Sequence, residues 1–314
     1  MKVNIKMKNE VNANPLVSII VITYNSAKYV IETLESAKYQ SCKNIELIIS
    51  DDCSTDDTVT VCETWIKENK DCFIRTKLIT VEQNKGIPAN CNRGVNTSNG
   101  EWIKLIAGDD ILLPNCIEDN LRFINLNKNA KIVFSTMQLF RKEDGKTIYL
   151  GISPLDNQKK MYELNANEQY NTLIESNWNW ATPSSFIQKK VIIDLDFYDT
   201  DYTHFEDYPF WIKATKKGVK LHFFDKATVL YRQSQSMMRP ENLWINEKYF
   251  QCYILFFNRQ ISNDLKKTNK KAYNLKRRHF FKLYVLIKIF GNKRSIIARL
   301  FNRMFHLFFK TIDL

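Results

Sequence analysis

The sequence predicts an α/β fold in which helices flank a mostly parallel sheet, and three observations support this assignment. Apolar, β-branched runs without polar alternation recur along the first hundred residues, as is typical of strands that are buried on both faces. Each of the first two runs is followed by Ser, Thr or Asp residues that can cap a helix, and then by apolar residues at helical spacing. Short connections between such segments are typical of successive βαβ units.

The first half of the chain supplies the parallel part of the sheet. Strands are predicted at 16–22, 45–49, 77–81 and 102–107, with helices after Ser26, after residues 54–57 and over 88–98. Polar clusters follow three of these strands, namely Thr23-Tyr24-Asn25, Asp51-Asp52 and Asp109-Asp110. Because the carboxyl ends of parallel strands meet at one edge of a sheet, we expect the three clusters to converge in one crevice.

The second half is less regular. A strand is predicted at 132–135, a variable stretch at 141–171, a helix over 208–217, and two strands at 219–224 and 227–231 that end at Arg232. Glu206 and Asp207 lie at the N-terminus of the predicted helix. Acids at this position are also favoured by capping and by the helix dipole, so the pattern leaves a catalytic role and a capping role open.

The pair Asp109-Asp110 is the first candidate for a ligand site. An apolar strand that ends on two carboxylates places negative charge at a sheet edge, which costs desolvation free energy unless a cation or hydrogen-bond donors compensate it. Hard oxygen ligands of this kind suit Mg²⁺ or Mn²⁺, which commonly share their coordination with substrate phosphates. Taken alone, the pair can also be a simple Asp-Asp turn.

Composition argues against several classes of protein. The 314 residues are 44% hydrophobic, enough for one large domain or two modest ones. The seven cysteines form no CxxC pair, which indicates free thiols in a reducing compartment, and the four scattered histidines argue against a His-based zinc site. No apolar run approaches the ~18–20 residues of a spanning helix. Neither a GxGxxG turn nor a GxxxxGK[ST] phosphate loop is present.

Seven short motifs occur in order between residues 15 and 235. They are residues 18–25, Asp51-Asp52 with Ser54-Thr55-Asp56, Asn92-Arg93-Gly94, residues 100–103, Asp109-Asp110, Glu206-Asp207 and Tyr231-Arg232. Together they resemble the inverting GT-A glycosyltransferases of family 2. The resemblance implies a GT-A fold that transfers a sugar from a nucleotide donor, with a divalent cation, Mn²⁺ or Mg²⁺, as cofactor.

The resemblance also implies roles for individual residues. Asp207 is expected to be the catalytic base, and Asp110 with Asp109 to hold the cation. The expected nucleotide-sugar site comprises Thr23, Tyr24, Asn25, Asp52, Lys85, Gly86, Arg93, Asp109 and Arg232. Trp178, Trp180 and Glu206 are candidates for the acceptor side, although core packing explains the two tryptophans equally well.

Two departures from the family pattern refine this hypothesis. Many relatives carry Arg where this chain has Cys91, so Lys85, Arg93 or Arg232 is expected to supply positive charge for the phosphates. The Gln-x-x-Arg-Trp signature of processive synthases is absent, which predicts one sugar transferred per encounter. We expect a hexose, glucose or galactose in β1,3 linkage, to move from a UDP-sugar to an undecaprenyl-diphosphate-linked GlcNAc in O-antigen or capsule assembly. The alternative is a catalytically silent carbohydrate- or membrane-binding protein of the same fold.

The C-terminal segment has a different charge from the rest of the chain. Residues 261–314 carry fourteen Lys and Arg against two acids, a net charge of +12, whereas residues 1–260 carry 32 of each sign. Residues 294–310 place Arg299 and Arg303 on one side of a helix and a bulky apolar face on the other. This pattern suits an anionic membrane surface, while packing onto the body is the alternative, and the absence of a recognisable module argues against nucleic acid.

These features predict three regions: a flexible leader (1–14), a GT-A catalytic domain (15–240) and a helical, basic, membrane-associating extension (241–314). The expected location is the cytoplasmic face of the bacterial inner membrane, as a peripheral protein.

Overall fold

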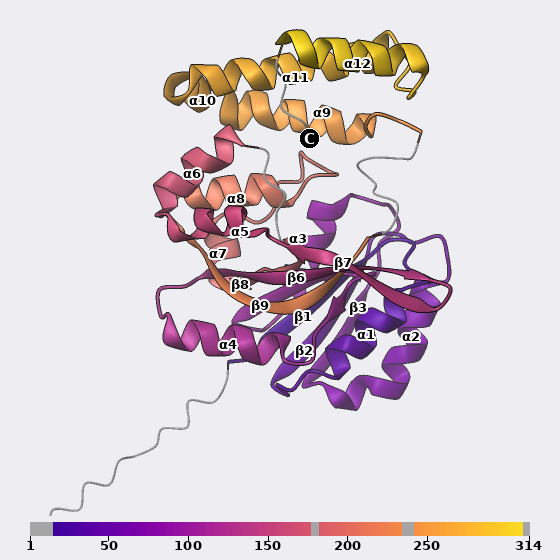
Figure 1. Ribbon diagram of the computed structural model, residues 1–314. Helices are drawn as coiled ribbons and strands as arrows, with labels where there is room; N and C mark the ends of the chain where they lie inside the picture. Colours follow the sequence, from indigo (N-terminus) through magenta and orange to yellow (C-terminus); the bar gives the residue numbers. More distant parts are fainter. Residues whose placement is uncertain (1–14, 177–181, 234–241, 310–314) are drawn as a thin grey trace, which may run out of the picture.

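The computed structural model describes residues 15–176, 182–233 and 242–309. These residues form one nine-stranded sheet with the order β3-β2-β1-β4-β8-β6-β9-β5, and β7 pairs with β6 outside this path. Helices cover the sheet, and a further layer formed by α9 to α12 lies beyond α8 (Figure 1). The predicted α/β architecture with C-terminal helices is confirmed.

Four strands form the parallel half of the sheet: β1 (Val17–Thr23), β2 (Ile45–Asp51), β3 (Arg75–Ile79) and β4 (Trp102–Ala107). Strands β1 and β2 are buried almost throughout, as their mostly apolar sequences predicted. The register sets Thr23 opposite Asp51, and Ile22 opposite Ala107. The polar clusters after these strands therefore share one edge of the sheet, as expected.

The helices of this half are α1 (Val30–Lys38), α2 (Thr58–Asn69), α3 (Ile87–Thr97) and α4 (Cys116–Leu126), with a short 3-10 turn, η1 (Lys70–Cys72), after α2. Buried Val30, Leu34 and Ala37 attach α1 to the core. The predicted cap at Ser26 is wrong in detail, because α1 begins only at Val30 and the Ser26 carbonyl accepts the Tyr29 and Val30 N–H groups. Helix α4 was not predicted.

The other half of the sheet is mixed. Its strands are β5 (Ile111–Leu112), β6 (Ile132–Glu143), β7 (Lys146–Ser153), β8 (Phe186–Gln188) and β9 (Leu221–Arg232). The two strands predicted at 219–224 and 227–231 are one strand, β9, and its register against β6 shifts between Phe224 and Ala227. The polar residues between the two predicted strands shift the register of β9 locally and do not end the strand.

The stretch predicted to be variable, 141–171, contains regular secondary structure. It contains the end of β6, strand β7, α5 (Asp156–Lys159), η2 (Lys160–Glu163) and the start of α6 (Ala166–Glu175). A short 3-10 turn, η3 (Thr182–Ser184), then precedes β8, and α7 (Lys189–Asp194) and α8 (Asp207–Lys216) follow. Helix α8 begins at Asp207, one residue before the predicted start.

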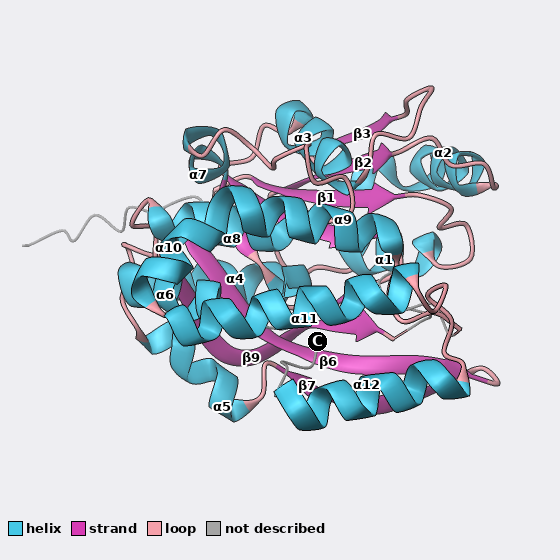
Figure 2. Cartoon of the chain, turned by 90° about the horizontal axis from the view of Figure 1, so that it is seen from above, coloured by secondary structure: helices cyan, strands magenta, loops and turns pink. Residues whose placement is uncertain are grey.

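The C-terminal helices are α9 (Glu247–Phe256), the π-type turn η4 (Phe257–Ile261), α10 (Ser262–Thr268), α11 (Lys270–Lys288) and α12 (Ile296–Phe309). Seen from above, α11 and α12 lie nearest the viewer (Figure 2). Aromatic rings join this layer to the body, because Phe205 contacts Tyr253 and Phe256 of α9, and Tyr253 contacts Phe280 of α11. Within the described ranges, no helix is long and apolar enough to cross a membrane.

Candidate functional site

The rim formed by β1 and β2 is held together by its own polar side chains. The Thr23 hydroxyl donates to Asp51 Oδ2 at 2.7 Å, and both residues are at least 98% buried. Tyr24, by contrast, is 49% exposed, and the side chain of Asn25 accepts a hydrogen bond from the Thr55 N–H. Of these three members of the predicted nucleotide-sugar site, Tyr24 therefore offers an accessible ring, whereas Thr23 is buried at the end of its strand.

Asp52 anchors the loop that precedes α3. Its carboxylate is 3% exposed and accepts hydrogen bonds from the Lys85 and Gly86 N–H groups and from Arg93 Nη2, the last at 2.6 Å. Each oxygen accepts two of these bonds, which uses most of the acceptor capacity of a carboxylate. The structure thus brings together four predicted site residues, Asp52, Lys85, Gly86 and Arg93, as one hydrogen-bonded unit.

The two acids after β4 differ in accessibility. Asp110 is 1% exposed, its Oδ1 accepts the Arg232 backbone N–H at 2.9 Å, and its Oδ2 has no hydrogen-bond partner among the described residues. Burial, and secondly the neighbouring charge of Asp109, raises the pKa of Asp110 well above its ordinary value. Asp109 is only partly buried, and burial also raises its pKa. An unpartnered carboxylate oxygen beside a second acid is an environment that a cation would stabilise.

The described residues contain no group of three or more His, Cys, Asp or Glu that could hold a metal ion unaided. A divalent cation at this position would therefore depend on Asp109, Asp110 and substrate phosphates. Mg²⁺ is commonly held in this way, through one or two carboxylates and the phosphates of its substrate. The donor set fits such an ion.

Arg232 stabilises the turn that carries Asp109 and Asp110. Its Nε donates to the Asp109 carbonyl at 2.7 Å, and Nη2 pairs with Glu32 at 3.1 Å. Its guanidinium lies 4.5 Å from the centre of the Tyr29 ring and 4.6 Å from that of Phe140. Because Arg232 is 5% exposed and paired, its charge serves the fold of the turn.

The other two candidates for a phosphate contact are Lys85 and Arg93. Arg93 is neutralised by Asp52, whereas the exposed Lys85 ammonium bonds the neutral amide of Gln83 and pairs with no carboxylate in the described part of the chain. Cys91 is fully buried. Lys85 is thus the cation of the three candidates whose charge is not already neutralised.

The second acid pair lies at the start of α8. Asp207 Oδ2 accepts the Thr182 hydroxyl at 2.9 Å, and Oδ1 accepts the Tyr208 N–H at 2.6 Å. Enclosure by the protein raises the pKa of Asp207. Burial and the Asp207 charge together raise the pKa of Glu206 to about 8. Glu206 makes no side-chain capping bond, so simple N-capping does not account for this residue.

The two acid pairs meet around Tyr231, the penultimate residue of β9. Burial raises the pKa of the Tyr231 phenol, and four carboxylates raise it further: Asp109, Asp110, Glu206 and Asp207. Hydrogen bonds link the two pairs as well: Thr182 donates to Asp207, and Lys104 of β4, the strand that ends just before Asp109, donates to the Pro183 carbonyl. Residues more than ninety positions apart in the sequence therefore share one environment.

The Asp52 loop is tied to the same region through Thr203. The Ile87 N–H donates to the Thr203 carbonyl at 3.0 Å, and a Cβ on Gly86 would lie 2.5 Å from that oxygen. Gly86 has φ +88°, which a glycine adopts without strain. A chain of direct contacts thus leads from Asp52 through Gly86 and Thr203 to the segment that carries Glu206 and Asp207.

Two functional candidates were missed in the sequence, Thr182 and Thr203. Thr182 lies in the same segment as Trp178 and Trp180, but a single threonine in a sequence does not indicate a functional role. The acceptor candidates Trp178 and Trp180 lie outside the described residues.

Comparisons with known proteins identify the family of this chain. Residues 18–189, more than half of the chain, match the family described as Glycosyl transferase family 2. An uncharacterized glycosyltransferase of Methanocaldococcus jannaschii is 26% identical over 258 residues, covering 77% of this chain and 84% of that protein. Glycosyltransferase GlyG of Streptococcus pneumoniae is 25% identical over 233 residues, covering 72% of this chain and 74% of its own length.

Solved structures show the same fold. S. aureus TarS 1–349 in complex with UDP superposes with a TM-score of 0.58 at 20% identity, covering 90% of this chain and 76% of that chain. The mannosyltransferase PcManGT from Pyrobaculum calidifontis, in complex with GDP-Man and Mn²⁺, gives a TM-score of 0.55 at 13% identity, covering 95% and 82%. The chain therefore has a GT-A-like fold, and its sequence identifies it as a member of glycosyl transferase family 2.

Proposed function

We propose that this protein is an inverting hexosyltransferase that moves one sugar from a UDP-sugar to a hydroxyl of a lipid-linked saccharide. The observation that carries this proposal is that two acid pairs, Asp109-Asp110 and Glu206-Asp207, act on the same buried phenol, that of Tyr231. One acid pair is suited to the donor diphosphate and the other to the acceptor hydroxyl. The solved relatives with UDP, UDP-GlcNAc and GDP-Man support a nucleotide-sugar donor.

Asp207 is the proposed general base. The acceptor hydroxyl must lose a proton as it attacks the anomeric carbon, and a carboxylate in reach can accept it, contributing roughly 10²–10⁴-fold to the rate. The raised pKa of Asp207 makes its carboxylate a stronger base than an ordinary aspartate. The Thr182 hydroxyl holds that carboxylate in one orientation. A single displacement inverts the anomeric centre, so an α-linked donor gives a β-glycoside.

The leaving nucleoside diphosphate carries the charge that develops in this reaction. A Mn²⁺ or Mg²⁺ ion held by Asp109 and Asp110 would stabilise that charge electrostatically. Of the two acids, Asp109 is the better placed to reach a ligand, because it is only partly buried whereas Asp110 is 1% exposed. The Lys85 ammonium is the proposed additional phosphate contact, and Tyr24 with Asn25 the proposed nucleobase contact.

The acceptor we propose is an undecaprenyl-diphosphate-linked GlcNAc, and the product a β1,3-linked glucose or galactose in O-antigen or capsule assembly. Two features support a lipid-linked acceptor: the basic C-terminal helices, and the aromatic contacts that connect them to the helix carrying Asp207. The protein would then work as a peripheral protein on the cytoplasmic face of the inner membrane, using soluble donor.

A donor screen tests this proposal. UDP- and GDP-sugars are incubated with the full chain, Mn²⁺ or Mg²⁺, and a synthetic lipid-diphosphate GlcNAc acceptor, and the product linkage is determined by NMR spectroscopy. We expect transfer from a UDP-hexose with inversion, and its loss in Asp207→Asn protein that retains the wild-type circular dichroism spectrum. If no donor is turned over but a sugar or nucleotide binds with equal affinity to wild-type and Asp207→Asn protein, the silent carbohydrate-binding alternative is favoured.

A further inference from the structure

The outer face of α12 is apolar and unusually exposed. Six large apolar side chains on it are 55–79% exposed: Ile296, Ile297, Leu300, Met304, Leu307 and Phe308. At about 3.6 residues per turn, they occupy one continuous arc of the helix. Ala298 and Phe305 lie on the opposite arc and are buried. Only part of the apolar face of this helix is therefore used for packing onto the body.

Cations border this apolar arc. Arg299 and Arg303 lie along one edge of it on α12, and both are exposed. Exposed Arg277 and Arg278 lie on the neighbouring helix α11. No acidic residue occurs anywhere from residue 265 to residue 312 of the sequence. The outer surface of α11 and α12 thus combines exposed apolar side chains with positive charge alone.

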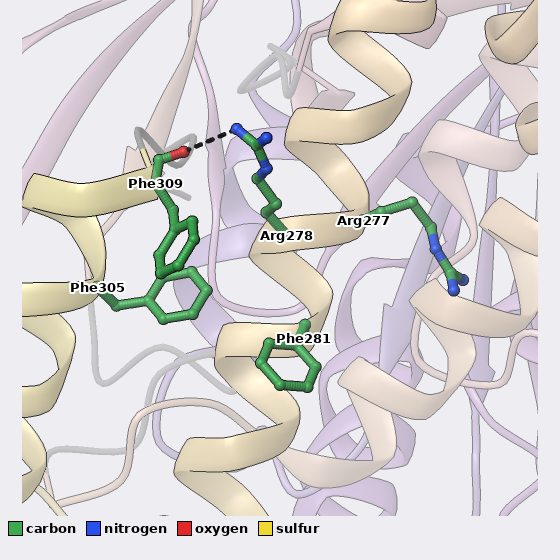
Figure 3. Close-up of a pocket in the computed structure, with 5 residues that line it drawn as sticks. All are labelled: Arg277, Arg278, Phe281, Phe305 and Phe309. Carbon is green, nitrogen blue, oxygen red and sulfur yellow. Dashed lines mark hydrogen bonds between the residues drawn. The ribbon is translucent and has the colours of Figure 1, made fainter.

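A groove between the two helices has the same character. It has a volume of about 300 Å³ and is lined by Arg277, Arg278, Phe281, Phe305 and Phe309. Figure 3 shows the three phenylalanine rings gathered on one side of Arg278, whose Nη1 donates to the Phe309 carbonyl at 3.3 Å. Arg277 extends away from the rings. A phosphate beside Arg278 could be bound there while an acyl chain contacts the phenylalanines.

We propose that α12 and the adjacent side chains of α11 form a docking surface for an anionic phospholipid bilayer. An interfacial helix needs an apolar face for the acyl boundary and cations for the headgroups, and this surface supplies both. A second copy of the chain is a poorer occupant, because pairing two such surfaces would oppose like charges with no acid between them. The proposal deepens the membrane location given above, but it rests on no catalytic step and can be tested without donor or acceptor.

Vesicle flotation with the full chain tests the apolar arc. Vesicles of phosphatidylcholine alone are compared with vesicles that also contain phosphatidylglycerol. The double variant Leu300→Ser, Phe308→Ser should bind the anionic vesicles at least about tenfold more weakly than wild type. The matched control is Leu126→Ser, Ile74→Ser, which removes two apolar side chains of comparable exposure, 80% and 65%. They lie at the end of α4 and just before β3, elements that are remote from α12 (Figure 1), and this variant should bind like wild type.

A second pair of variants tests the charge. Arg299→Gln, Arg303→Gln should weaken binding to the anionic vesicles about tenfold or more and reduce its sensitivity to salt. The control, Arg122→Gln, Lys190→Gln, removes two exposed cations elsewhere and should leave binding unchanged. Transfer to a water-soluble acceptor should be the same in all four variants, which separates membrane docking from the chemistry.

Three results would overturn the proposal. Wild-type protein that does not float with anionic vesicles refutes docking outright. Equal binding by the Leu300→Ser, Phe308→Ser variant and its control would place the contact elsewhere. A dimer in light scattering that this variant dissociates, without vesicle binding by wild type, would assign the surface to a second copy of the chain.

Discussion

Replacing Thr182 with Val should shift the pH dependence of sugar transfer. The Thr182 hydroxyl donates to Asp207 Oδ2 at 2.9 Å and accepts from Trp211 Nε1 at 3.3 Å. Valine has almost the same shape, so the substitution removes these two hydrogen bonds and little packing. The bond to Asp207 stabilises the ionised carboxylate, and its loss must raise the pKa of a group whose pKa is already raised by burial.

The size of the shift follows from the strength of one charge-assisted hydrogen bond. Such bonds contribute about 1.5–3 kcal/mol, and one pKa unit corresponds to about 1.4 kcal/mol, so the pKa of Asp207 should rise by about one to two units. A base must be deprotonated to act, so the transfer rate is lost as pH falls through the higher pKa. The Trp211 ring is 1% exposed, and leaving its N–H unpaired should lower the free energy of unfolding by about 1 kcal/mol.

The assay is the pH profile of kcat/KM for sugar transfer, combined with urea unfolding. Thr182→Ser is the matched control, because it keeps the hydroxyl and should keep the acid limb of the profile in place. The rates of Thr182→Val and wild type should converge at high pH, where Asp207 is ionised in both. The reasoning would be refuted if the acid limb lay at the same pH in Thr182→Val and Thr182→Ser and the rate of Thr182→Val were lowered equally at every pH. Thr182 would then not act through the ionisation of Asp207.

Gly86→Ala should raise the KM for the donor and lower stability by about 1–3 kcal/mol, since φ is +88° and the new Cβ would meet the Thr203 carbonyl at 2.5 Å; an unchanged KM in steady-state kinetics would contradict this. Because the pKa of Glu206 is raised to about 8 in the folded protein, the free energy of unfolding of wild type should fall as pH rises from 5 to 8. Glu206→Gln should reduce this fall, and urea unfolding of both proteins across this pH range checks it. Asp109→Asn should increase the Mn²⁺ concentration needed for half-maximal transfer without changing Tm, whereas Asp110→Asn should also change Tm, because its carboxylate is buried against Arg232.

The parallel half of the sheet was predictable because its information is local. Residues 16–22 and 45–49 are almost entirely apolar, and such a short apolar run is typical of a strand that is buried on both faces. The convergence of the polar clusters then follows from parallel pairing, whatever the side-chain details. The mixed half was predicted only in part: the strand at 132–135 is the start of β6, and the two strands at 219–224 and 227–231 are the single strand β9. Both strands are partly exposed and irregular in register, so neither a continuous apolar run nor a clean alternation marks their full length.

The side-chain roles were less predictable than the positions. Arg232 was one of three candidates for the phosphate contact, and nothing in the sequence indicated that it pairs with Glu32, which lies 200 residues away. Thr182 lies beside Asp207 because η3 packs against α8. This contact between distant segments cannot be predicted from the local sequence. The amphipathic pattern of α12 correctly predicted a helix, but which part of its apolar face is buried depends on the shape of α11.

A crystal structure of the full chain with UDP and Mn²⁺ tests the central claim most directly. We expect the diphosphate and the ion at Asp109, with Asp207 facing the β-phosphate across the space where a sugar would lie. Nucleotide bound in a different part of the molecule, or a closed crevice with Asp207 directed away from the diphosphate, would contradict it.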